Sequence, residues 1–245
     1  MVPERKAYGE GLTHIAGVAR PVSLADEQSL PVLPPLEPLL PRTGLQRGFT
    51  VVVEGGPGVN SLALALAAGP SKAGSWVAVA GMPALGIAAA AEMGIVLERL
   101  ILIAAPSPQL WPAVAGALID AFDLVLVAWP NISGTMARRL GHRMRERRGV
   151  LISLTTHSAA NSSWSDAADL RLRVIAARWH GIGCGHGRLQ SREALVETSG
   201  RRSAMPRRTL LRLPDCSGGV ASTDAHLAEG LTSQPSKAIS AGGRG

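Results

Sequence analysis

The sequence predicts an α/β fold with a mostly parallel central sheet, and three observations support that prediction. A β-branched run at 50–54 leads into a glycine-rich loop and then a strong helix former. Strand-like and helix-like segments then alternate as far as residue 155, which favours right-handed crossovers and a parallel sheet covered on both faces. Beyond residue 164 the pattern changes to residue-by-residue alternation, which is typical of antiparallel strands.

The alternation assigns each element in turn. Parallel strands are expected at 50–54, 76–80, 100–103, 124–128 and 150–155, with helices at 61–68, 83–93, 111–121 and 136–148. Antiparallel strands are expected at 170–175, 187–192 and 208–213, with their arginines on the solvent face. Five prolines at 31–41 deny that stretch a continuous helix and favour an extended or turn-rich tether that lays leucines on the core.

The composition fits one main domain. A chain of 245 residues with 46% hydrophobic and only 3% aromatic content can bury one core of small aliphatic side chains. We expect a partly mobile N-terminal segment at 1–29, a core domain at 30–214 and a disordered tail at 215–245. Glycines and prolines interrupt the apolar stretches, no signal peptide is recognisable, and the two cysteines form no C-x-x-C pair. These features predict a cytoplasmic protein without membrane contact.

The glycine-rich loop at 54–62 is the candidate nucleotide site. A working phosphate loop, G-x-x-x-x-G-K-[ST], holds phosphates with backbone N–H groups and a lysine, and its hydroxyl binds magnesium. This loop keeps the hydroxyl but has no lysine before the helix. The vestigial nucleotide-binding candidates are Gly55, Gly56, Gly58, Asn60 and Ser61. We favour a structural turn without a bound cofactor over the alternative, a retained ATP site.

Basic residues are concentrated in the second half of the chain. Residues 138–245 hold 18 lysines and arginines against 8 acidic residues, whereas 1–137 hold 7 against 10. Such a bias suits nucleic acid, an acidic partner or a solvated face. The candidate nucleic-acid-binding or partner-binding residues are Arg138, Arg139, Arg143, Arg145, Arg147, Arg148, Arg171, Arg173, Arg178, Arg188, Arg207 and Arg208.

Two further groups admit a functional or a structural interpretation. His180, Cys184 and His186 could be zinc ligands, but no fourth ligand is nearby, so we favour a glycine-rich hairpin connection and expect no metal site. Trp129 and Trp164 follow strand ends, where they could stack on bases. We favour packing in the core.

The order of several short motifs resembles the ATPase core of RecA over residues 33–213. Those motifs are a leucine segment and a G-L-x-x-G turn at 36–48, the glycine loop, and the segments 91–100, 122–128 and 169–174. The resemblance fails where RecA has its catalytic charges. Residues 80–83, AGMP, replace the acid that activates water, and residues 128–130, AWP, replace the Walker B carboxylate. The resemblance therefore implies a RecA-like, P-loop-type core that is not an enzyme.

The segments 177–183, 185–189 and 206–214 resemble the ImuA family, specifically its actinobacterial branch of RecA-like mutagenesis accessory proteins. This resemblance implies a scaffold role in SOS translesion synthesis at the nucleoid. The implied partners are an ImuB-like Y-family polymerase homologue and an error-prone C-family DNA polymerase, with RecA as a further candidate. Two alternatives remain open: a RecA-type ATP-binding or ATP-hydrolysing repair protein, and a basic DNA-binding module. Weak DNA binding and self-association are compatible with each.

Overall fold

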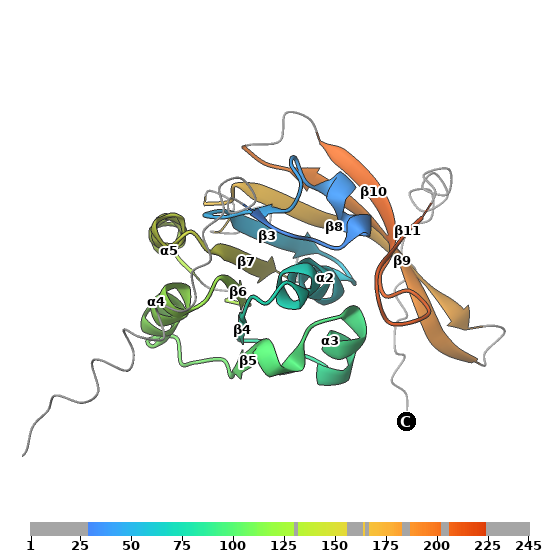
Figure 1. The fold of residues 1–245 in the computed structure, drawn as a ribbon, viewed down its shortest axis with the longest axis horizontal. Helices are drawn as coiled ribbons and strands as arrows, with labels where there is room; N and C mark the ends of the chain where they lie inside the picture. Colours follow the sequence, from blue (N-terminus) through green and yellow to red (C-terminus); the bar gives the residue numbers. More distant parts are fainter. Residues whose placement is uncertain are drawn as a thin grey trace, which may run out of the picture.

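A nine-stranded mixed sheet with helices on both faces forms the centre of the molecule (Figure 1). The computed structural model describes residues 29–129, 132–155, 164, 167–182, 187–201 and 206–223. The strand order across the sheet is β11-β10-β9-β8-β3-β7-β6-β4-β5. A separate two-stranded sheet pairs β1 (Ser29–Leu30) with β2 (Leu45–Gln46).

The parallel part of the sheet agrees with the sequence prediction. It comprises β3 (Thr50–Gly55), β4 (Val77–Ala80), β5 (Leu100–Ile103), β6 (Leu124–Val127), β7 (Val150–Thr155) and the first half of β8 (Leu170–Ile182). The antiparallel part continues with β9 (Gly187–Ser199), β10 (Arg207–Arg212) and β11 (Ala221–Ser222). The predicted fold class, with a parallel centre and antiparallel C-terminal strands, is confirmed.

Helices cover the two faces of the parallel part in pairs. The pair α2 (Val59–Lys72) and α3 (Ile87–Met93) lies on one side, and the pair α4 (Trp111–Ala121) and α5 (Gly134–Arg147) lies on the other (Figure 1). Alternate residues of β3 divide between them: Val51 and Val53 join the cluster that contains α2, while Val52 joins the cluster of α4 and α5. Burial on both faces explains why these strands are continuous apolar runs.

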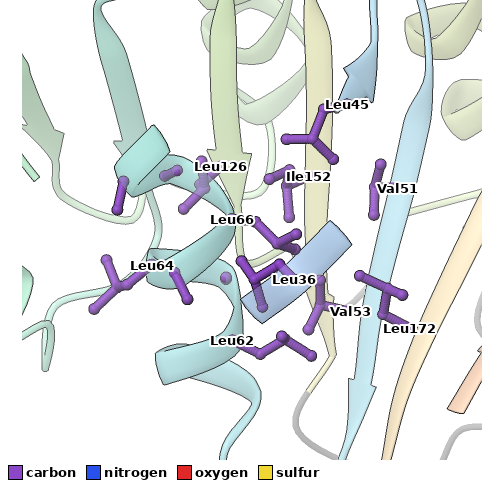
Figure 2. Packing of buried hydrophobic residues seen from close by; sticks show 14 of the residues in the cluster. Leu36, Leu45, Val51, Val53, Leu62, Leu64, Leu66, Leu126, Ile152 and Leu172 are labelled. Carbon is purple, nitrogen blue, oxygen red and sulfur yellow. The ribbon is translucent and has the colours of Figure 1, made fainter. Parts of the chain in front are cut away.

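The proline-rich segment, expected to be extended or turn-rich, contains one short helix. Residues Pro34–Leu39 form a 3-10 helix, η2, with prolines at its first positions, where a missing N–H is tolerated. Leu36 and Leu39 are fully buried. Leu36 lies between α2 and the strands of the sheet, beside Leu66 (Figure 2). The expectation that this segment lays leucines on the core is confirmed.

The folded core continues past the expected boundary at residue 214. The carboxylate of Asp215 accepts hydrogen bonds from Ser217 and from the backbone N–H of Gly219, which organises a turn that leads into β11. Burial raises the pKa of Asp215, but these hydrogen bonds outweigh burial and hold that pKa below its usual value. β11 then pairs with Leu211 and Arg212 of β10. The prediction of a disordered tail that begins at residue 215 is therefore wrong for residues 215–223. Residues 1–28 and 224–245 lie outside the described part.

Within the described residues, none of the helices combines the length and the apolar character that crossing a bilayer requires.

Candidate functional site

The glycine loop joins the carboxyl end of β3 to the first turn of α2. Gly55 has φ +119°, and a Cβ added there would lie 2.3 Å from the carbonyl oxygen of Val174. Gly58, at φ +123°, is the residue before the helix and has no side chain to cap it. These positions require glycine whatever binds there. Asn60 is exposed and Ser61 half-buried in the first turn, so the predicted loop residues do lie together.

Arg192 of β9 places its guanidinium in this loop. Its Nη2 donates to Ser61 Oγ at 2.7 Å, and its Nε donates to the carbonyl oxygen of Leu213 at 2.8 Å. The guanidinium carbon lies 4.8 Å from the centre of the Trp179 ring. Only 6% of the residue is exposed, and burial lowers the pKa of Arg192 from its ordinary value. The second candidate feature of the site is thus a buried cation from a distant strand.

The prediction that the arginine at the end of the 187–192 strand faces solvent is wrong for Arg192. β9 continues to Ser199, and residues two apart on a strand lie on the same face. Arg192 therefore lies on the same face as Ala194 and Val196, both of which are buried in the cluster that contains α2. Its side chain therefore points to the α2 side of the sheet. The parity with Ala194 and Val196 was the signal in the sequence that could have identified this residue.

Apolar packing occupies the strand ends where RecA has its catalytic acids. Gly81, directly after β4, has φ +78°, and a Cβ there would lie 2.8 Å from Cη2 of Trp111 and 2.7 Å from the carbonyl oxygen of Ala128. Trp129, two residues after β6, stacks on Trp111 with ring centres 5.1 Å apart and planes 8° from parallel. Both tryptophans are buried. Hydrocarbon, and no carboxylate, therefore occupies these two positions at the ends of β4 and β6.

Residues 38–160 match the family model described as "MT3502 N-terminal domain". The chain belongs to this family. The matched range contains the glycine loop, Gly81 and the tryptophan pair, whereas Arg192 lies beyond it. The MT3502-family chain is 42% identical over 98 residues to "Uncharacterized protein Rv3395c" of Mycobacterium tuberculosis (strain ATCC 25618 / H37Rv). That match covers 39% of this chain and 47% of the relative, so it spans about half of the relative's length.

A solved structure resembles this MT3502-family chain over most of its length. The match is titled "Crystal structure of the RadB recombinase", with a TM-score of 0.55 and 17% sequence identity. It covers 78% of this chain and 97% of the other. At that level of identity the similarity concerns the fold, and it shows a RecA-like fold, as the sequence resemblance implied.

The predicted arginines on α5 of the MT3502 domain are mostly engaged with carboxylates. Arg143 and Arg147 both contact Asp120 of α4, and Nη2 of Arg145 lies 3.6 Å from Asp169. Arg138, Arg139 and Arg148 are also exposed, and Arg148 ends the helix in the left-handed conformation. This surface mixes both charges. A shallow pocket in it is lined by Asp120, Arg139, His142, Arg143, Glu146 and Arg147.

The predicted arginines of the C-terminal strands are interleaved with glutamates. Arg178 lies 3.2 Å from Glu193, Arg208 lies 2.8 Å from Glu197, and Arg171 lies 3.7 Å from Glu54. Register places Arg173 opposite Glu197. Arg207 donates to the carbonyl oxygen of Leu40 at 3.0 Å, and Arg188 is exposed beside the 214–218 turn. Pairing of this kind reduces the charge available to phosphates.

The candidate zinc ligands lie only partly within the described residues. His180 lies 3.0 Å from Glu193, while Cys184 and His186 fall outside the described residues. Within the described part, no three His, Cys, Asp or Glu residues form a metal-binding group.

Trp129 and Trp164 are 8% and 1% exposed, so they pack in the core and the base-stacking interpretation is wrong.

The Asp120 cluster predicts a specific acid response of the MT3502-family chain. Hydrogen bonds from Arg143, opposed by desolvation and assisted by Arg147, lower the pKa of Asp120 from 3.8 to about 2. A lowered folded-state pKa contributes stability that is present above the unfolded value and is lost as pH falls through the folded one. We expect Asp120→Asn to lower the Tm at about pH 6 but to leave it nearly unchanged near pH 2. Melting curves across that range test this; a difference between variant and wild type that does not change with pH contradicts it.

Proposed function

We propose that this chain is a non-catalytic, RecA-fold accessory protein of DNA-damage-induced translesion synthesis. The observation that carries the proposal is the packing of Trp111 against Gly81 and Trp129, at the strand ends where RecA has its two acids. Hydrolysis of ATP needs a group that orients water and a carboxylate that holds magnesium. A retained core with apolar side chains at both positions supports selection on the fold and its surfaces without selection on hydrolysis.

The proposed partners are an ImuB-like Y-family polymerase homologue and an error-prone C-family DNA polymerase, with RecA as a further candidate. The resemblance of segments 177–183, 185–189 and 206–214 to the ImuA family supports this assignment. The RecA-like fold supports a role connected with DNA repair. We place the protein in the bacterial cytoplasm, and at the nucleoid when it acts.

Three measurements, on the purified chain and in its source strain, test the proposal. We expect no magnesium-dependent ATP hydrolysis above background, with or without single-stranded DNA, and the same result for Ser61→Ala. We expect the chain to co-purify with the ImuB-like protein of the same genome. Deletion of the gene should lower damage-induced mutation frequency, and both wild type and Ser61→Ala should restore it. Hydrolysis that Ser61→Ala abolishes, or a deletion without effect on mutation frequency, contradicts the proposal.

The same preparation distinguishes the scaffold from a DNA-binding module. Paired arginines on α5 and on the C-terminal strands favour weak binding to single-stranded DNA that falls steeply with salt. Fluorescence anisotropy measured against salt concentration reads this directly. Affinity on the order of 10 nM at physiological salt would support the module in place of the scaffold.

A further inference from the structure

We propose that the guanidinium of Arg192 occupies the glycine loop and excludes phosphate groups from it. The loop contacts an arginine of its own chain in the space where a phosphate loop receives its ligand. This inference concerns the loop alone, and it stands whether or not the chain acts in mutagenesis.

The position of the guanidinium supports this proposal. Its Nη2 uses Ser61 Oγ, the hydroxyl that a working loop offers to magnesium. Its carbon and Nη2 both lie 3.5 Å from the point where a Cβ on Gly58 would be. The guanidinium is therefore in van der Waals range of the turn itself, at the amino end of α2, whose first N–H groups have no acceptor within the helix. Those N–H groups are the ones that bind phosphate in loops of this kind.

Besides Ser61, two segments hold Arg192 in place. Its side chain donates to Leu213 after β10, and the aromatic face of Trp179 on β8 lies against it. Its backbone is fixed as well, because its N–H donates to the carbonyl oxygen of Pro214 at 2.9 Å and its own carbonyl accepts from Leu213 at 2.6 Å. A phosphate that entered the loop would have to break the bond to Ser61 and displace the guanidinium from the ring.

The surroundings of the Arg192 charge indicate that its guanidinium is fixed in the loop and is not a free basic side chain. Among the described residues, no carboxylate contacts Arg192; the acceptors that contact it are a hydroxyl, a carbonyl oxygen and an aromatic ring. It also faces the amino end of α2, where a positive charge is unfavourable. Burial of an arginine in that setting is maintained by the specific bonds to Ser61 and Leu213. Arg192 thus occupies the loop at an electrostatic cost that the surrounding contacts offset.

A factorial experiment tests whether Arg192 excludes ligands. Asn60 is exposed and directly precedes Ser61, which is the position of lysine in the phosphate-loop pattern. We would compare wild type, Asn60→Lys, Arg192→Ala and the double variant, each titrated with pyrophosphate and with magnesium ATP by calorimetry and thermal melting. Wild type and Asn60→Lys should bind neither ligand at about 1 mM, and the double variant should bind at least about tenfold more tightly than Asn60→Lys.

The matched control is Asn60→Lys combined with Arg188→Ala, which removes an exposed arginine from the same strand. It should behave as Asn60→Lys alone. If Arg192→Ala does not fold, Arg192→Met replaces it, because Met keeps an apolar stem beside Trp179 and lacks the guanidinium. The proposal is overturned if wild type binds pyrophosphate at micromolar concentration, or if removing Arg192 from the Asn60→Lys protein gives no gain in affinity.

Discussion

Gly81→Ala should lower the free energy of unfolding by about 3 kcal/mol, since it combines overpacking with a positive φ. A methyl group there would lie 2.8 Å from the Trp111 ring and 2.7 Å from a carbonyl oxygen, and neither atom belongs to a flexible side chain. Urea denaturation followed by circular dichroism measures the loss. For the same reason, Gly81→Glu should destabilise the chain without producing ATP hydrolysis, although it restores an acid at that position of the sequence.

The control for this prediction is Gly74→Ala. Gly74 also has a positive φ, +99°, but its nearest neighbour would be Nη1 of Arg99 at 3.8 Å, an ordinary contact. We expect it to lose about 1 kcal/mol, the cost of the backbone conformation alone. Equal losses for the two variants would mean that the tryptophan does not fill the space beside Gly81. The interpretation of that space as closed to a catalytic acid would then be wrong.

Leu36→Ala should cost about 3 kcal/mol, because it empties a site enclosed by α2 and the strands (Figure 2). The residue is fully buried although it precedes residue 38, where the family match begins. Leu97→Ala, at an exposed leucine, should change the free energy of unfolding by no more than about 0.5 kcal/mol. Denaturant midpoints of the two variants measure these losses of stability. A Leu36→Ala protein as stable as Leu97→Ala would show that η2 is not part of the core.

The parallel centre of the fold could be predicted because its inner strands are buried on both faces. Segments such as Val77–Ala80 and Leu124–Val127 are entirely apolar, so their identity does not depend on what pairs with them. The glycine loop could be located for a similar reason, since Gly55 and Gly58 have backbone conformations that other residues avoid. Local chemistry was sufficient in both cases.

The contacts of the candidate site could not be predicted, because they join residues far apart in the chain. The bond from Arg192 to Ser61 joins residues 131 positions apart, and no local pattern in the sequence indicates it. The packing of Trp111 over Gly81 likewise joins segments 30 residues apart. The extension of β8 beyond residue 175 follows from pairing along the hairpin, and its sequence there has no regular alternation.

The position of β3 has a consequence for synthesis of the chain on the ribosome. β3 is made early, yet its two neighbours in the sheet are β7 and β8, and its first N–H donates to Asp169, 119 residues later. None of its ladder hydrogen bonds can form until β7 has been made. The nascent chain must therefore carry an unpaired strand, with three consecutive valines at 51–53, while residues 56–149 are translated. Its sheet closes only when the C-terminal third emerges, so folding of this protein is a late and largely collective event.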